Sequence, residues 1–331
     1  MEKILEITRQ NIVERTHFGT LILFGNNKTM AEFGHDGSNA CYFLRSCAKP
    51  LQASVCADLG VFDYFGFSQE EIAILCASHS GSFENVAIVE SILEKLDLDL
   101  SYLQCGTHQP LDREAREFLI KNDIPPNPLH HNCSGKHAGF LAACIKEGWD
   151  TATYLDIEHP LQKLVWDRIG TYCEYGHGEV SKDGCGAPIW AMPLENMCRG
   201  FLNCFENYPQ IKEAMASNPY FMGGHGRIDS EITASSKGKL IAKVGAEGLC
   251  MVYNSDESQV VLIKILDSNE QARAFALIHA MLELGWLSQR DVFSTELQKF
   301  YDKDIKTQTG DIVGEIRPYG VFSNMFLNLC K

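Results

Sequence analysis

The spacing of apolar and polar positions predicts strands near the two ends of the chain and helices between them. Close to the N-terminus, the apolar run at residues 20–24 is followed by a Gly-Asn-Asn-Lys sequence, which is typical of a hairpin turn. Further runs rich in β-branched residues, punctuated by glycine or by Asn-Ser-Asp, lie at 239–244, 249–253 and 260–265. The sequence therefore predicts that both ends of the chain contribute strands.

The middle of the chain has the periodicity of amphipathic helices. Apolar residues recur there at helical spacing around residues 86–96, 140–145, 161–169, 194–205 and 211–215. Ser68-Gln-Glu-Glu71 matches a capping box, so we expect a helix to begin just after Ser68. Another helix is predicted from Gln271 to Leu284, with Gly285 as its C-terminal cap.

Strands at both ends and helices in the middle favour an α+β fold. We expect one antiparallel sheet built from both chain ends and flanked by helices, with a helical lobe inserted. On this interpretation residues 1–331 form a single bilobed catalytic unit. Its sheet layer comes from about 1–45 and 238–331, and its helical lobe from about 46–237.

Charge and composition exclude several classes of partner. The 331 residues include 29 basic and 43 acidic side chains, a formal net charge of −14, and a surface this acidic repels nucleic-acid backbones and anionic lipids. The N-terminal residues lack the apolar core of a signal peptide, and no apolar run approaches a membrane span. We expect a cytoplasmic protein whose 13 cysteines are free thiols or metal ligands rather than disulfides.

The first candidate for chemistry is the pair Ser46 and Lys49, which stand three positions apart. On a helical turn such residues share one face, and an amine can then remove the proton of a serine nucleophile. Pro50 disfavours helical geometry in the residue before it, so we expect the pair at an irregular helix entry. The competing interpretation is a helix-capping serine with a solvated lysine.

Two other segments offer a second hydroxyl and a second amine. Ser78 lies in the small, polar sequence Ala77-Ser-His-Ser-Gly81, which suits a capping loop or a hydroxyl that relays a proton or binds substrate. Lys264 lies between Ile263 and Ile265 in a strand-like run, so it points away from both of them. If it faces the cleft, burial lowers its pKa and makes it a candidate base; periodicity favours a solvated edge lysine.

Cysteines in two glycine-rich segments are candidates for a nucleophile or a metal site. His130-His-Asn-Cys-Ser-Gly-Lys-His137 is not a phosphate-binding loop, because histidines stand where that motif needs Gly and Ser or Thr. Cys133 in this segment could be a thiolate nucleophile or a metal ligand. Cys185 lies between two glycines, which suits a ligand or a reactive thiol, and we nominate Cys133 and Cys185 as a zinc-binding pair.

Taken in order along the chain, these segments carry a family resemblance. They are Arg45-Ser-Cys-Ala-Lys-Pro50, Ala77-Ser-His-Ser-Gly81, His131-Asn-Cys-Ser-Gly-Lys-His-Ala-Gly139, Asp183-Gly-Cys-Gly-Ala-Pro188 and Lys243-Val-Gly-Ala-Glu-Gly248. The chain resembles the rhizobial-type, or class 3, L-asparaginases, also labelled asparaginase II. The resemblance implies a fold like that of serine β-lactamases and glutaminases, a homodimer, and hydrolysis of L-asparagine to L-aspartate and ammonia.

The resemblance also implies roles for individual residues. It assigns two Ser-Lys tandems, Ser46 with Lys49 and Ser78 with Lys264; a zinc site of Cys133, Lys136 and Cys185; and substrate-binding roles for Arg45 and Asp183. A lysine that binds zinc must be neutral, which requires a depressed pKa. Cys47, inside the Ser-x-x-Lys segment, departs from the family, where a smaller residue such as serine is more usual.

The sequence therefore predicts an amidohydrolase in which Ser46 attacks the side-chain amide and Lys49 is the base. Backbone N–H groups near Ser46 and in the Ser78 loop are the expected donors to the oxyanion. Two alternatives stay open at this point: an amidohydrolase that uses Cys133 as its nucleophile, and a non-catalytic sensor of an amino acid or zinc on the same fold.

Overall fold

A computed structural model describes residues 2–34, 40–176 and 178–319. The strands of its main sheet are β1 (Glu2–Arg9), β2 (Ile12–Gly25), β3 (Lys28–Phe33), β7 (Leu240–Val244), β8 (Leu249–Asn254), β9 (Gln259–Ile265), β10 (Asp304–Lys306) and β11 (Ile312–Pro318). Neighbouring strands are antiparallel in the order β10-β11-β1-β2-β9-β8-β7, and β3 pairs with β2. A smaller sheet contains β4 (Tyr42–Phe43), β6 (Pro188–Met192) and β5 (Val180–Lys182), in that order.

Most of the helices lie in the sequence between β3 and β7. They are α1 (Lys49–Asp58), α2 (Val61–Phe65), α3 (Gln69–Cys76), α4 (Phe83–Lys95), α5 (Arg113–Lys121), α6 (Ser134–Glu147), α7 (Pro160–Tyr172), α8 (Leu194–Asn207), α9 (Pro209–Ser217), α10 (Pro219–Met222) and α11 (Ile228–Ser235). A single 3-10 turn, η1 (Arg45–Ala48), leads into α1, and α12 (Glu270–Glu283) and α13 (Gln289–Phe293) follow β9.

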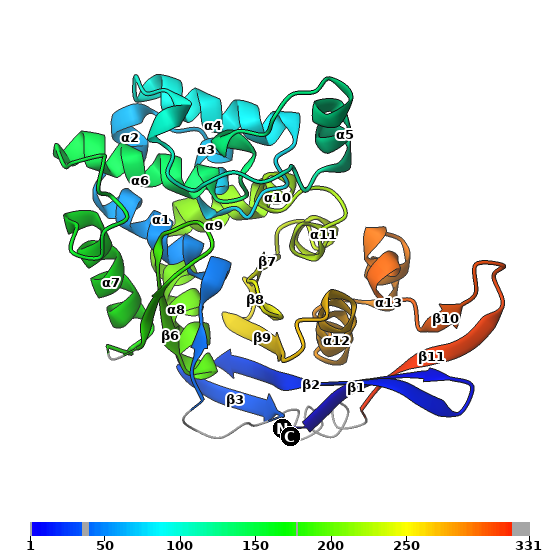
Figure 1. Ribbon diagram of the computed structural model, residues 1–331. Helices are drawn as coiled ribbons and strands as arrows, with labels where there is room; N and C mark the ends of the chain where they lie inside the picture. The colour runs from blue at the N-terminus through cyan, green and yellow to red at the C-terminus, as the bar shows by residue number, and fades with distance from the viewer. Residues whose placement is uncertain (1, 35–39, 177, 320–331) are drawn as a thin grey trace.

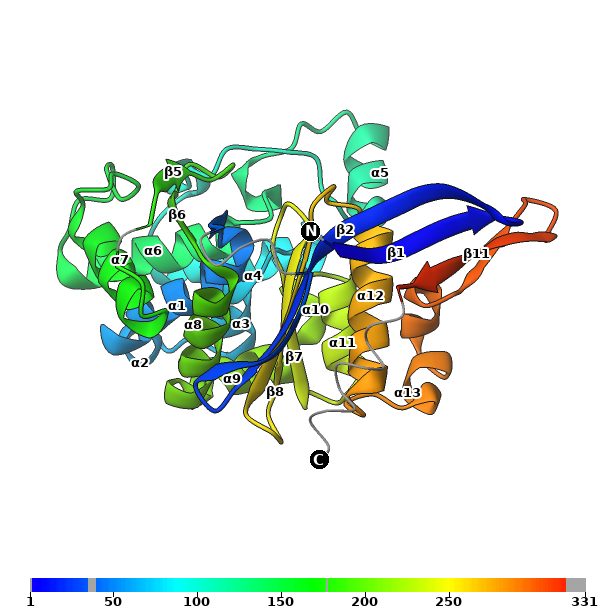
Figure 2. The same cartoon turned by 90° about the horizontal axis from the view of Figure 1, so that it is seen from below.

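Helices cover both faces of the central strands, as Figures 1 and 2 show, with α8 on one side and α11 and α12 on the other. Side chains alternate across the strands, so each face has its own core. Ile22 and Phe24 of β2 join the core beneath α1 and α8, whereas Leu21 and Leu23 join the core beneath α12. A sheet buried on both faces explains why its strands are continuous apolar runs rather than alternating ones.

This arrangement agrees with the predicted α+β class and its antiparallel sheet. The predicted strand at 20–24 lies inside the longer β2, and the predicted run at 239–244 coincides closely with β7. The capping box at Ser68 is confirmed: its hydroxyl accepts from Glu71 N at 3.2 Å, and Glu71 accepts from Ser68 N at 2.7 Å. The division into a sheet layer and an inserted lobe at the stated boundaries stays a prediction.

Two further features concern the chain as a whole. In the parts of the chain that the structure describes, no helix is both long and apolar enough to cross a bilayer. The cysteines of these same parts are free thiols, and all of them except Cys41 are buried.

Candidate active site

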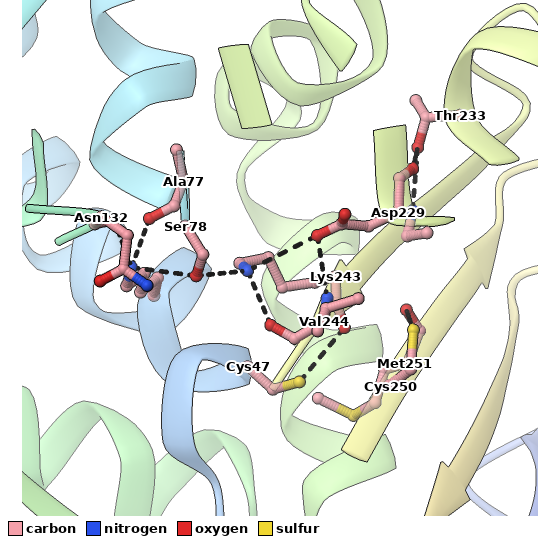
Figure 3. Close-up of polar contacts among 12 residues, drawn as sticks. Cys47, Ala77, Ser78, Asn132, Asp229, Thr233, Lys243, Val244, Cys250 and Met251 are labelled. Carbon is pink, nitrogen blue, oxygen red and sulfur yellow. Dashed lines mark hydrogen bonds and ion pairs between the residues drawn. The ribbon is translucent and has the colours of Figure 1, made fainter. Parts of the chain in front are cut away.

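Ser78 lies directly after α3 and Ala77, in the loop that leads to α4 and faces β7 of the main sheet. Its backbone N–H donates to the carbonyl of Met222 at 2.9 Å, which fixes the loop against the end of α10. Two lysine amines reach its hydroxyl from separate elements: Lys49 Nζ at 3.1 Å and Lys243 Nζ at 2.9 Å. Figure 3 shows the Lys243 amine directed at the Ser78 hydroxyl. The Ser78 side chain is therefore held between two buried amines.

Lys243 is the base candidate of this cluster. It points from β7 to the same face of the sheet as Ile241, which the core beneath α1 and α8 covers, and it is wholly buried. Its amine also contacts Val244 O at 2.8 Å and lies 3.9 Å from Asp229 Oδ2. Burial is the main cause that lowers its pKa to about 8. A substantial fraction of Lys243 can then be neutral near physiological pH, with a lone pair that accepts the Ser78 proton.

Lys49 has the contacts of a charged donor. This buried residue begins α1, and its amine donates to the carbonyl of Ala77, to Asn132 O at 3.2 Å and to Ser78 Oγ at 3.1 Å. An ammonium group has three N–H donors, and three acceptors surround this one. Lys49 is thus arranged to polarise the Ser78 oxygen rather than to take its proton.

A second cluster joins α6 to the loop before β6. Lys136 Nζ lies 3.1 Å from Cys185 Sγ, and the thiol of Cys133, the residue that precedes α6, contacts the same sulfur. The Cys133 hydrogen bond and the charge of Lys136 hold the pKa of Cys185 well below its usual range. Burial lowers the pKa of Lys136, but Cys185 and Cys133 more than offset it, and the net pKa is raised. The Cys185 thiolate and the Lys136 ammonium thus form an ion pair, and the Cys133 thiol lies beside them.

The donors of this cluster suit a borderline-soft metal ion. Thiolates and a neutral nitrogen are ligands that zinc accepts in tetrahedral sites. In the structure as described, no group of three or more His, Cys, Asp or Glu side chains could hold a metal. A zinc ion here would therefore depend on the Lys136 amine as the third ligand, after that amine has lost its proton.

Arg45 and Asp183 form an ion pair at the edge of the same region. Arg45 Nε donates to Asp183 Oδ1 at 2.9 Å, and its Nη1 reaches Glu247 Oε1 at 3.3 Å. Arg45 has a left-handed backbone with φ of +48°, directly before Ser46. Such strain in a residue other than glycine persists only where the surrounding structure imposes it, and it is common at functional sites. The pair offers one cationic and one anionic group to a zwitterionic ligand.

Comparison with known proteins fits this arrangement of groups. The family model described as L-asparaginase II matches residues 5–318. The chain belongs to this family. It is therefore an amidohydrolase of the asparaginase type. No curated protein matches the chain.

The structure does not place every residue with the partner that the sequence interpretation assigned to it. Ser46 lies on η1 and is half-buried, and in the part of the chain that is described its side chain makes no hydrogen bond to Lys49. The Lys49 amine donates instead to Ser78 and to two backbone carbonyls, and the Ser46–Lys49 tandem stays a prediction. The predicted irregular helix entry is confirmed, since Ser46 lies in η1 and Lys49 begins α1.

The amines that contact Ser78 in the described structure are those of Lys49 and Lys243, so the Ser78–Lys264 tandem stays a prediction. Lys264 is neither on Ser78 nor a solvated edge lysine: it lies buried on the central strand β9 and donates to the carbonyls of Glu247 and of Ile265. Strand β8 separates β9 from β7, and Lys264 lies two residues along β9 from Leu262, the residue in line with Lys243. At ~4.8 Å per strand and ~3.4 Å per residue, the two lysine backbones lie about 12 Å apart. The sheet register aligns Lys243 with Met251 and Leu262.

Lys243 is the candidate site residue that the sequence interpretation missed. It stands in the segment Lys243-Val-Gly-Ala-Glu-Gly248, whose resemblance to the family was noted without assigning the lysine a role. A lysine inside a strand whose other four residues are apolar and buried was the available signal. Such a strand has no solvent face, so its lysine must find partners in the interior.

The structure also bears on the Ser78 N–H as an oxyanion donor and on Cys133 as a nucleophile. The Ser78 N–H is bonded to Met222 O, so it does not serve as the expected oxyanion donor in this arrangement. The hydrogen bond to Cys185 and burial raise the pKa of Cys133, which is then a thiol and a weak nucleophile. The structure thus gives no support to a Cys133 nucleophile.

Neighbouring side chains hold the Ser78 loop and the β7 strand in place. His79 Nε2 contacts Ser134 Oγ at 2.9 Å, while His79 Nδ1 accepts from Gly81 N at 3.1 Å. Ser134 is the first residue of α6, so this histidine ties the Ser78 loop to the helix that carries Lys136. On the other side, the Cys47 thiol donates to Lys243 O at 3.3 Å and joins η1 to β7.

Proposed function

We propose that this amidohydrolase converts L-asparagine to L-aspartate and ammonia, with Ser78 as the nucleophile and Lys243 as its base. The observation that supports the proposal is the position of Ser78 Oγ between a neutralisable amine at 2.9 Å and a second amine at 3.1 Å. A serine needs an adjacent base to attack an amide, and Lys243 has the lowered pKa that a base requires.

The proposed reaction passes through an acyl-enzyme. Ser78 Oγ gives its proton to Lys243 Nζ and attacks the side-chain amide carbon, while the Lys49 ammonium donates to the Ser78 oxygen and stabilises its developing negative charge. The protonated Lys243 then gives its proton to the departing nitrogen, which leaves as ammonia. Water attacks the ester, Lys243 takes the proton of that water, and the proton returns to Ser78 as L-aspartate leaves.

Arg45 and Asp183 are proposed to hold the charged ends of the amino acid. The guanidinium suits an α-carboxylate and the carboxylate suits an α-ammonium group. In the structure these two groups neutralise each other at 2.9 Å. Binding of substrate then exchanges one ion pair for two, which leaves no charge in the site unpaired.

A zinc ion is proposed beside this site, held by Cys133, Cys185 and a neutral Lys136. When bound, it would supply positive charge next to the pocket and fix α6 relative to the loop that carries Cys185. The Ser78–Lys243 chemistry does not depend on it. A homodimer and a fold related to serine β-lactamases and glutaminases complete the proposal.

Trapping the acyl-enzyme tests which serine attacks. The protein is mixed with asparagine, quenched in acid within the first turnover, and digested for peptide mass spectrometry. We expect an aspartyl adduct on Ser78, and no adduct in Ser78→Ala. An adduct on Ser46 would reassign the nucleophile and leave Ser78 as a proton relay. Calorimetric binding of asparagine without release of ammonia would favour a non-catalytic sensor.

A further inference from the structure

A buried carboxylate lies behind the base of this site. Asp229, the second residue of α11, is fully buried, and Figure 3 shows it beyond Lys243 as seen from Ser78. Its Oδ2 lies 3.9 Å from Lys243 Nζ and accepts from Val244 N at 3.2 Å. Ser78, Lys243 and Asp229 thus follow one another as hydroxyl, amine and carboxylate, each within interaction distance of the next.

The contacts of Asp229 also fix where the amine points. Lys243 Nζ donates to the carbonyl of Val244 at 2.8 Å, and the backbone N–H of Val244 donates to Asp229 Oδ2 at 3.2 Å. Thr233 Oγ1 accepts from Ala242 N at 3.1 Å and donates to Asp229 O at 3.0 Å. Helix α11 is therefore bonded to β7 on either side of Lys243 in the sequence, and the carboxylate has little freedom to move away.

The second oxygen of this carboxylate lacks a hydrogen-bond partner among the described residues. Backbone crowds the space around it, since a Cβ added at Gly223 would come within 2.7 Å of Asp229 Oδ1. A buried carboxylate with one unpartnered oxygen is costly, so its negative charge must be balanced by nearby cations. Burial raises the pKa of Asp229, but Lys243 and Arg227 more than offset this, and the net pKa is lowered.

Asp229 supplies negative charge beside Lys243, where most of the other charged groups are cations. The titratable and charged groups that act on this pair from the packed elements are Lys49, Arg227, Arg273, Cys47, Cys76 and Cys250, together with Asp229 itself. The cations disfavour the protonated Lys243, and the thiols are neutral. Asp229 is the carboxylate that favours the protonated form, which the amine must adopt after it accepts the Ser78 proton.

We propose that Asp229 is a positioning residue for the reaction: it holds the Lys243 amine on Ser78 and stabilises that amine when it becomes protonated. The inference rests on the proposed function of Ser78 and Lys243. It extends the pair to a Ser78–Lys243–Asp229 relay, in which the carboxylate acts on the base and does not touch the substrate.

The test is the pH profile of Asp229→Asn. Asparagine keeps an oxygen acceptor for Val244 N–H but removes the negative charge, so the pKa of Lys243 should fall. The acid limb of kcat/KM, where the base becomes protonated, should then move to lower pH by about one unit or more. The plateau of kcat should fall about tenfold or more, with KM little changed. An acid limb that stays at the wild-type pH would overturn the proposal.

Controls separate this charge effect from structural damage. Ser230→Ala removes a neighbouring buried hydroxyl that has no partner among the described residues, and it should leave the profile unchanged. Thr233→Val loosens α11 from β7 without changing a charge. Thr233→Val should lower the denaturation midpoint but leave the acid limb of kcat/KM at the wild-type pH. If the acid limb moved as far in Thr233→Val as in Asp229→Asn, a role for the Asp229 charge would be contradicted.

Two measurements keep the test decisive if turnover fails or the variant unfolds. Lysine side-chain NMR titration, with the Lys243 signal assigned by its loss in Lys243→Met, measures the same shift without catalysis. If the wild-type protein releases no ammonia from asparagine, that result contradicts the proposed function but not the interaction of Asp229 with Lys243. If Asp229→Asn does not fold, the double variant Asp229→Asn/Lys243→Met should fold, because it removes both charges and leaves neither one unpaired. A double variant that also fails to fold would overturn the proposed pairing of Asp229 with Lys243.

Discussion

Ser78 Oγ lies 2.9 Å from Lys243 Nζ, although 165 positions separate the two residues in the sequence. The hydroxyl comes from the loop between α3 and α4, and the amine comes from the edge strand β7 of the main sheet. The contact therefore exists only while the α3–α4 loop is packed against β7. This dependence links the proposed catalytic chemistry directly to the integrity of the fold.

The two lysines of the sheet give a matched pair of variants. Lys243→Met should reduce kcat/KM by about 100-fold to 10,000-fold, which is the usual contribution of a general base. Lys264→Met removes a lysine that is buried on the same face of the sheet but bonded to backbone carbonyls. It should cost about 1–3 kcal/mol of stability with little loss of turnover. Ammonia release and denaturant melts of both variants check this, and equal activity losses would restore Lys264 to the site.

The pH dependence of kcat/KM should report the Lys243 amine. Because this amine must be neutral to accept a proton, activity is expected to rise with pH and to be half-maximal near the pKa of about 8. Below that pH the amine is protonated and cannot act as a base. Steady-state rates of ammonia release across pH 5–10 provide the measurement. A profile that is flat between pH 6 and 9 would rule out Lys243 as the titrating base.

Zinc content should depend on the sulfurs beside Lys136. Cys185→Ser removes the sulfur with the depressed pKa and should reduce bound zinc, measured by elemental analysis after gel filtration, to background. Cys144→Ser is the matched control, because Cys144 is a buried thiol of α6 whose pKa burial raises to about 12. The control should retain zinc. Equal zinc in wild type and Cys185→Ser would exclude this site.

Substrate affinity should depend on Asp183. Asp183→Asn keeps the shape of the side chain but removes the charge expected to bind the α-ammonium group. KM for asparagine should rise about tenfold or more, ~1.4 kcal/mol, with a smaller change in kcat. Glu247→Gln is the control, since the Glu247 side chain contacts Arg45 at 3.3 Å but is 66% exposed. A similar rise in KM for both variants would argue against a specific role for Asp183.

His79 should contribute to stability and to the position of Ser78. This buried imidazole joins Gly81 N and Ser134 Oγ, and burial is the main cause that lowers its pKa well below the usual value. His79→Ala leaves Gly81 N without its acceptor, while Ser134 Oγ keeps its bond to Leu129 O at 3.0 Å. The variant should therefore cost about 1–3 kcal/mol. Denaturant melts measure the loss, and kcat/KM measures the displacement of Ser78. Unchanged stability would show that the loop holds without this link.

Local features were readable from the sequence because they depend on neighbouring residues. The capping box at Ser68, the strand within β2 and the irregular helix entry at Lys49 all rest on contacts within a few positions. The segments around Ser78 and Cys185 also stand out in the sequence, and the structure places their side chains against buried lysine amines. In each of these cases short-range geometry decides the outcome.

Which amine meets which hydroxyl was decided by the tertiary structure alone. Lys243 and Lys264 both lie in apolar strand sequences and point to the same face of the sheet, so periodicity cannot rank them. Strand order and register place Lys243 next to Ser78 and leave Lys264 two strands away. Lys49, three positions from Ser46, turns instead to Ser78 because buried carbonyls satisfy its charge. Sequence determined the groups available for catalysis, and long-range packing determined their partners.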